Sequence, residues 1–239
     1  MEIIKKIANK QDFYNNKPVT IAILGDSVSH GCFECYMDGE VLQTIYDTKS
    51  SYGTRLKEIL NILYPSSQIN IINSGISGDS AGNGYARIER DILSYNPDLC
   101  IVSYQLNDSC QKEEGIELYK NHLKNIFKKL KSHNVEIIFL TENTMCTSVS
   151  NLLPTQTEQK LAKDFSDIQN SGIEKMYRDA AIEVCEGENI KYVDIYSVWE
   201  RFINNKVNLD YILANKLNHP TRPFHYYIAI KIVELMLED

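Results

Sequence analysis

The sequence predicts a three-layer α/β sandwich built on a mostly parallel, five-stranded sheet. Five short runs consist almost wholly of apolar residues without polar alternation, which is typical of strands buried on both faces. These runs span residues 19–24, 69–72, 99–102, 137–140 and 192–195. Longer stretches with helical spacing separate them. Strands that alternate with helices are joined by right-handed crossovers, which place helices on both faces of the sheet.

The clearest predicted helix spans residues 113–133. Its apolar residues recur at steps of three and four and form one face: Ile116, Tyr119, Leu123, Ile126, Phe127 and Leu130. Glutamates at its start and lysines near its end both complement the helix dipole. Further helices are expected at residues 52–63 and 85–93, at 157–185 with a break near Ser171 and Gly172, and from Pro223 onward.

The chain is expected to form one domain, residues 1–239, because it has no internal repeat and no linker rich in proline or glycine. Lysine and arginine number 25 against 32 acidic residues, which gives a net charge of −7. That charge argues against a nucleic-acid partner, since backbone phosphates require a basic surface.

No membrane span is expected, because the longest aliphatic or aromatic run covers only residues 226–230. The first ten residues lack the continuous apolar stretch of a secretory signal. Six cysteines are scattered without a disulfide framework, which favours reduced thiols. A cytoplasmic location is therefore expected, or a secreted one if a signal has been removed.

Chemically useful side chains follow the predicted strands. Gly25-Asp26-Ser27 follows the first, residues 73–78 the second, 104–108 the third and 141–143 the fourth, while Asn218-His219-Pro220 precedes the last helix. In open α/β sheets, ligands bind beyond the carboxyl ends of the strands. A serine, glycine-containing turns, an amide and a histidine are therefore expected on one rim.

Residues 21–27, Ile-Ala-Ile-Leu-Gly-Asp-Ser, resemble the opening block of the GDSL family, also called SGNH hydrolases. The family's other blocks follow in order up to His219. The resemblance implies a flavodoxin-like fold and a serine esterase that needs no metal and no organic cofactor. It implies that Ser27 is the nucleophile and His219 the general base. It also implies an oxyanion hole made by Ser27, Gly78 and Asn107.

This chain departs from the family pattern at two places. Gln105 stands where the third block usually has glycine. Lys216 stands where the fifth block usually has aspartate, and Asn215 is the nearest polar equivalent. We therefore expect a Ser-His dyad in which Asn215, or a backbone oxygen, orients the His219 ring in place of a carboxylate.

The chemistry requires these residue types. A serine hydroxyl is a poor nucleophile until a base removes its proton, and the same base then protonates the leaving alcohol. Amide donors stabilise the oxyanion that develops, and loss of one donor typically costs about 10²–10³ in rate. The leading expected substrate is an acetylated carbohydrate, a small-molecule or glycan ester.

Other interpretations of the same residues remain open. Gly25-Asp26-Ser27 could be only a turn and His219 only a helix-entry residue. A carbohydrate-binding protein with impaired catalysis and a lipid or lysophospholipid acylhydrolase are the alternative functions. Cys32 and Cys35 could form a redox dithiol or half of a zinc site. The long segments 31–50 and 141–156 are expected to be loops that wall the site.

Overall fold

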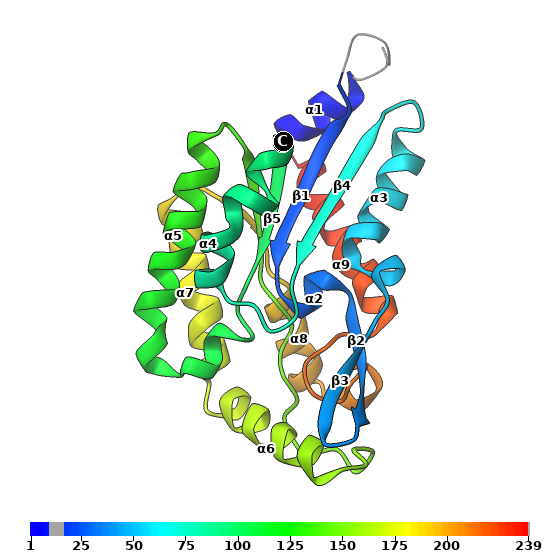
Figure 1. Cartoon of the computed structure of the whole chain (residues 1–239), viewed down its shortest axis with the longest axis vertical. Coiled ribbons are helices and arrows are strands. Elements are labelled where there is room, and N and C mark those ends of the chain that lie inside the picture. The colour runs from blue at the N-terminus through cyan, green and yellow to red at the C-terminus, as the bar shows by residue number, and fades with distance from the viewer. Residues whose placement is uncertain (10–16, 239) are drawn as a thin grey trace.

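The computed structural model describes residues 1–9 and 17–238 and contains the predicted parallel sheet (Figure 1). The strand order is β4-β1-β5-β6-β7. The strands are β1 (Val19–Gly25), β4 (Ile69–Gly75), β5 (Leu99–Ser103), β6 (Glu136–Leu140) and β7 (Lys191–Val193). All five apolar runs are strands, although the last is shorter than predicted because Asp194 caps the helix that follows it.

Helices cover both faces of the sheet. They are α1 (Glu2–Ala8), α2 (Ser27–His30), α3 (Tyr52–Leu63), α4 (Ala81–Asp91), α5 (Ile116–Ser132), α6 (Gln156–Asn170), α7 (Ile173–Gly187), α8 (Ile195–Asn204) and α9 (Arg222–Leu237). Short 3-10 turns are η1 (Thr48–Ser50), η2 (Leu93–Tyr95), η3 (Asp108–Gln111), η4 (Glu113–Gly115) and η5 (Leu209–Tyr211). The predicted break between α6 and α7 is confirmed, with Gly172 in the left-handed region at φ 85°. Helices α1 and α8 were not predicted.

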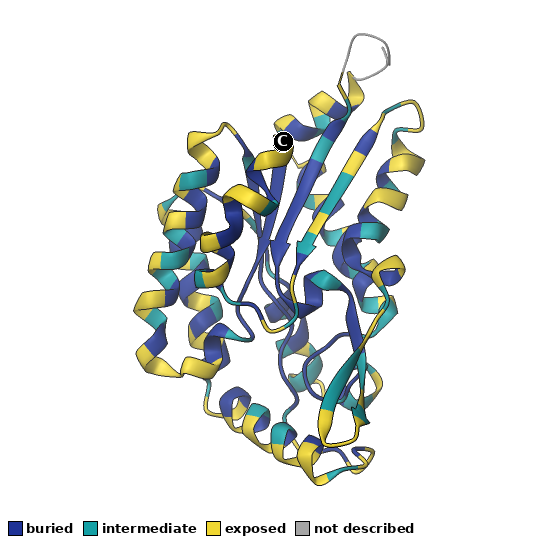
Figure 2. Cartoon of the chain, in the orientation of Figure 1, coloured by how far each residue is buried: buried dark blue, intermediate teal, exposed yellow. Residues whose placement is uncertain are grey.

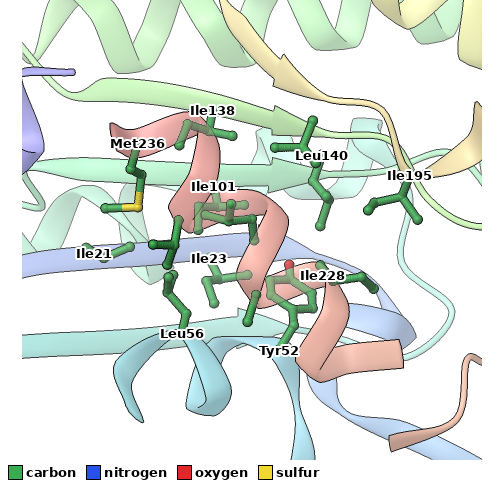
Figure 3. Packing of buried hydrophobic residues seen from close by; sticks show 14 of the residues in the cluster. Ile21, Ile23, Tyr52, Leu56, Ile101, Ile138, Leu140, Ile195, Ile228 and Met236 are labelled. Atoms are coloured by element: carbon green, nitrogen blue, oxygen red, sulfur yellow. The ribbon is translucent and has the colours of Figure 1, made fainter. Parts of the chain in front are cut away.

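Strand residues alternate between two apolar cores. Ile21 and Ile23 of β1 pack on the side of α3 and α9, while Ala22 and Leu24 pack on the side of α4, α5 and α7. Figure 3 shows the first core, where strand side chains meet Leu56 of α3 and helix α9. Figure 2 shows β1 and β5 buried along most of their length. Burial on both faces accounts for the lack of polar alternation in these strands.

A two-stranded antiparallel hairpin was not predicted. Strands β2 (Cys32–Asp38) and β3 (Val41–Tyr46) lie within a segment that was expected to be a loop. Only Cys32 and Phe33 of the hairpin are buried, so most of it lies outside the main cores and carries little hydrophobic pattern. The hairpin extends beyond the carboxyl end of β1 (Figure 1), where it can contribute to a site.

Within residues 1–9 and 17–238, no helix combines the length and the apolar character that crossing a membrane would require.

Candidate active site

Ser27 lies at the first position of helix α2, directly after strand β1. The Asp26 carboxylate caps this helix by accepting a hydrogen bond from the Val28 N–H at 2.9 Å. A Cβ at Gly25 would lie 2.2 Å from the Ser29 hydroxyl and 2.8 Å from the Ser103 carbonyl, so the tight turn requires glycine. The turn therefore fixes Ser27 at the carboxyl edge of the sheet, with only 4% of the residue exposed.

His219 lies in the loop before α9, and its ring reaches Ser27. The distance from His219 Nε2 to Ser27 Oγ is 3.1 Å, although the two residues are 192 positions apart. His219 Nδ1 lies 3.0 Å from the Phe33 carbonyl oxygen of the hairpin. Because a carbonyl can only accept, Nδ1 carries the ring proton and Nε2 presents its lone pair to the serine hydroxyl.

Burial lowers the pKa of His219 to about 4, because the apolar surroundings disfavour the imidazolium. The ring is therefore neutral at pH 7, which is the state that a general base requires. The described residues place no carboxylate on the ring, and the main-chain oxygen of Phe33 takes the orienting position.

Asn215 organises the loop rather than the ring. Its side-chain oxygen accepts hydrogen bonds from the backbone N–H groups of Leu217, Asn218 and His219 at 2.9–3.0 Å. The Lys216 ammonium donates to the carbonyls of Asp210 and Leu213. Asn215 therefore does not orient the His219 ring, because its Oδ1 is already used by the loop. A backbone oxygen, that of Phe33, orients the ring instead.

A second segment braces the histidine loop from the β6 side. Residues 141–146 were expected to be part of a loop that walls the site, and they form a loop that is buried. The Cys146 N–H donates to the Leu217 carbonyl at 2.7 Å, and the Asn143 amide donates to the Asn218 carbonyl at 2.8 Å. These bonds restrict the main chain next to His219.

Two backbone N–H groups, one after β1 and one after β4, are free to bind an anion. Gly78 has φ 78°, a left-handed conformation that favours glycine, and a Cβ there would meet nothing within 4 Å. Within the described ranges, neither the Ser27 N–H nor the Gly78 N–H donates a hydrogen bond. The open space beside Gly78 leaves room for a ligand.

Asn107 follows β5 and is held by two acceptors. Its side-chain nitrogen donates to Asp26 Oδ2 at 2.8 Å and to the Asp79 carbonyl at 2.9 Å. These bonds place the amide between the Ser27 turn and the turn that contains Gly78. Both of its N–H groups already have acceptors in the resting structure.

Gln105, the departure in the third block, points away from this rim. Its side chain is fully buried, donates to Glu174 Oε1 of α7 at 2.6 Å and accepts from the Glu142 N–H at 3.4 Å. A side chain at this position is therefore accommodated inside the protein, and it leaves the approach to Asn107 unobstructed.

Arg87 braces the carboxyl ends of β1 and β4, and it was not predicted to be part of the site. Its guanidinium donates to the backbone carbonyls of Gly25 and Ser74 and pairs with Asp79 at 2.6 Å. The only sequence signal was its place in a predicted helix after the glycine-containing turn. Burial with Asp79 distinguishes it from a solvated surface arginine.

The two hairpin cysteines are free thiols. Burial raises the pKa of Cys32 to about 12 and also raises the pKa of Cys35. Redox and zinc-binding thiols require the opposite shift. Among the residues that the structure describes, no group of three or more His, Cys, Asp or Glu side chains is arranged to hold a metal ion.

Solved structures share this fold. A two-domain esterase active on acetylated mannans matches with a TM-score of 0.70 and 18% identity over 99% of this chain and 54% of that one. The chain thus spans about half the length of that esterase. The acetyl xylan esterase AlAXEase matches with a TM-score of 0.68 and 18% identity over 92% of this chain and 100% of that one. A catalytic mutant of Axe2, an acetylxylan esterase from Geobacillus stearothermophilus, matches with a TM-score of 0.67 and 15% identity over 92% of this chain and 95% of that one.

No curated protein matches the sequence. Residues 23–225 match the model of the GDSL-like Lipase/Acylhydrolase family, and this range contains both Ser27 and His219. With most of its length matched and the sheet of this fold present, the chain belongs to the GDSL-like lipase/acylhydrolase family of carboxylic ester hydrolases.

Proposed function

We propose that the protein is a serine esterase that removes acetyl groups from O-acetylated carbohydrates. The observation that carries this proposal is the contact of 3.1 Å between Ser27 Oγ and His219 Nε2, with the other ring nitrogen held by the Phe33 carbonyl. The neutral ring next to a buried hydroxyl is the arrangement that activates a serine. The free N–H groups of Ser27 and Gly78 lie on the same rim.

In the proposed reaction, Ser27 Oγ attacks the acetyl carbonyl carbon and its proton passes to His219 Nε2. The carbonyl oxygen becomes an oxyanion, which accepts from the N–H groups of Ser27 and Gly78 and from the Asn107 amide. One Asn107 N–H shifts from its resting acceptor toward the oxyanion as the charge develops. The imidazolium then protonates the sugar oxygen, and the carbohydrate leaves.

Water completes the cycle. His219 Nε2 accepts a proton from water, and the hydroxide attacks the acetyl group on Ser27. Collapse of the second tetrahedral intermediate returns the imidazolium proton to Ser27 Oγ and releases acetic acid, which ionises to acetate in water. The free enzyme is regenerated without a metal or an organic cofactor.

The preference for acetylated carbohydrate rests on what the structural neighbours are described as acting on, acetylated mannans and acetyl xylan. These neighbours are 18% identical or less, so the assignment of substrate is tested separately from the assignment of chemistry. The alternatives are a lipid acylhydrolase and a carbohydrate-binding protein with little turnover.

The test compares wild type, Ser27→Ala and Ser29→Ala on p-nitrophenyl acetate, on longer acyl esters and on acetylated xylo- and manno-oligosaccharides followed by mass spectrometry. Ser29 is a matched control, because its hydroxyl lies in the same helix but bonds the Tyr52 hydroxyl at 2.7 Å. We expect Ser27→Ala alone to abolish release of acetate. Equal rates in Ser27→Ala and wild type would refute the nucleophile. Faster turnover of long acyl chains would favour the lipid acylhydrolase, and binding without turnover the carbohydrate-binding protein.

A further inference from the structure

A cluster of buried carboxyl groups lies behind the proposed oxyanion hole. Its members, each at most 5% exposed, are Asp26, Asp79, Asp108, Glu142 and Glu174. Within the described part of the chain, Arg87 is the one cation that pairs with the cluster, and it pairs with Asp79. Buried carboxylates without a cation are strongly disfavoured, so some members must hold a proton or accept several hydrogen bonds.

Each oxygen of the Asp26 carboxyl accepts a hydrogen bond from an N–H group. Its Oδ1 accepts from the Val28 N–H at 2.9 Å, and its Oδ2 accepts from the Asn107 side-chain amide at 2.8 Å. These two bonds tie the cap of the Ser27 helix to the proposed oxyanion donor. A hydrogen bond also joins the Asp26 carboxyl to that of Glu142.

Glu142 has the complementary arrangement. Its Oε2 accepts from the Leu106 N–H at 2.7 Å and the Gln105 N–H also interacts with the carboxyl, whereas Oε1 is buried without a hydrogen-bond partner among the described residues. Two carboxyl groups can share a hydrogen bond only if one of them is protonated. Each Asp26 oxygen already accepts an N–H, whereas Glu142 Oε1 has no hydrogen-bond partner among the described residues, so the shared proton belongs on Glu142 Oε1.

We propose that Glu142 is a positioning residue that stays protonated at neutral pH and, by donating to Asp26, holds the Asn107 amide in place for the oxyanion. The proposal rests on the proposed function for its catalytic consequence. The chain of contacts runs from the Leu106 N–H through both carboxyl groups to Asn107. Leu106 precedes Asn107, so Glu142 is linked to the segment of the oxyanion donor directly through the Leu106 N–H and indirectly through Asp26.

The charges around the pair favour this protonation state. Burial raises the pKa of both groups, that of Asp26 to about 7 and that of Glu142 well above its usual range. The hydrogen bond between them lowers the pKa of Asp26 and raises that of Glu142, which places the proton on Glu142. The other ionisable groups that face the pair are Asp79, Asp108, Glu174, Tyr52, Tyr104, Tyr119, Cys32 and Arg87. Burial raises the pKa of the three tyrosines and of Cys32, which keeps these groups uncharged. Arg87 is neutralised by Asp79 and Asp91, so among the residues that the structure describes no cation offsets a second negative charge at the pair.

Three variants test the proposal. Glu142→Gln keeps an oxygen for the Leu106 N–H and replaces the acid proton by an amide N–H that cannot be lost. Glu142→Ala removes both. Glu174→Gln is the matched control, because it also neutralises a buried carboxyl of the cluster, but that carboxyl bonds Gln105 and not Asp26.

We expect Glu142→Ala to lower kcat about tenfold or more with little change in KM, less than the loss of an oxyanion donor itself. Glu142→Gln restores most of that activity. We also expect the kcat of wild type and of Glu174→Gln to fall at alkaline pH, where Glu142 releases its proton. The kcat of Glu142→Gln should not fall there, because its amide has no proton to release. If Glu142→Gln is as impaired as Glu142→Ala, Glu142 acts as an ion and the proposal is wrong. It is equally wrong if both variants match wild type in rate and pH profile.

Infrared spectroscopy tests whether Glu142 is protonated without measuring activity. In a Ser27→Ala background at pH 7, the difference spectrum between the proteins with and without Glu142→Gln is expected to show the loss of one carbonyl stretch of a protonated carboxylic acid. Absence of that difference overturns the protonation. Full activity in Ser27→Ala would instead overturn the proposed function and leave the infrared result standing, so the two failures are distinguishable.

Discussion

Arg222 ties the His219 segment to the hairpin that orients the His219 ring. It follows His219 by three residues, and its guanidinium pairs with Glu34 of β2 at 2.6 Å and with Asp47 beyond β3 at 2.8 Å. The same group lies 4.3 Å from the centre of the Phe33 ring. Phe33 supplies the carbonyl that bonds His219 Nδ1. Arg222→Ala is therefore expected to loosen the orientation of the base.

The size of the effect follows from exposure. The side chains of Arg222, Glu34 and Asp47 are 36%, 40% and 29% exposed, so solvent screens both ion pairs. Exposed pairs contribute about 0.2–1 kcal/mol each. The contact of the guanidinium with the Phe33 ring adds about 0.5–1 kcal/mol. A total of about 1–3 kcal/mol favours the docked hairpin, and because about 1.4 kcal/mol corresponds to tenfold, we expect kcat to fall by between about fivefold and about a hundredfold.

Lys231→Ala is the matched control. Lys231 lies on the same helix, pairs with Glu234 at 2.6 Å and lies 5.7 Å from the Tyr227 ring centre, but it does not touch the hairpin. Steady-state kinetics on p-nitrophenyl acetate and urea unfolding are measured for both variants. We expect similar small losses of stability and a loss of kcat only in Arg222→Ala. Added salt should lower the wild-type kcat toward that of Arg222→Ala. Equal kcat in all three proteins would refute the reasoning.

Three further outcomes are expected. Burial depresses the pKa of His219 to about 4, so the active neutral ring persists as pH falls. The value of kcat/KM should therefore decline with a midpoint near pH 4. A midpoint near about 6.5, the pKa of a free histidine, would contradict this. Asn107→Ala should lower kcat about 10²–10³-fold with the protein still folded by circular dichroism, and a loss under about threefold would remove Asn107 from the oxyanion hole. Gly78→Ala should destabilise by about 1–2 kcal/mol through its positive φ alone, whereas Gly25→Ala, with a Cβ 2.2 Å from the Ser29 hydroxyl, should cost about 3 kcal/mol or more; urea unfolding that ranks them the other way would contradict the geometry.

The sheet could be predicted because its strands are buried on both faces. A short continuous apolar run such as residues 99–102 is typical of a parallel strand that helices cover on both sides. The rim could be predicted because parallel strands deliver their following loops to one edge. That logic predicted that the loops containing these residues share one rim, and the resemblance to the GDSL family singled out Ser27, Gly78, Asn107 and His219 within them.

The hairpin could not be predicted, and with it the orienting partner of the histidine was missed. Its strands bury little surface, so hydrophobic patterning does not reveal them. The Phe33 carbonyl is a main-chain atom that every residue has, so no side-chain motif indicates its role. The shared proton of Asp26 and Glu142 also has no sequence signal, because it depends on two carboxyl groups meeting inside the fold from distant positions in the chain.

The missing aspartate and the hairpin carbonyl together account for the character of the proposed base. A carbonyl fixes the tautomer of His219 as a carboxylate would, but it carries no charge to stabilise the imidazolium. The low pKa of His219 follows, since burial is opposed only by a neutral acceptor. The ring is then ready to accept a proton over a wide acidic range, yet each proton transfer to it is more costly. The carbonyl in place of the aspartate therefore predicts an enzyme that keeps its activity at acidic pH and has a modest kcat.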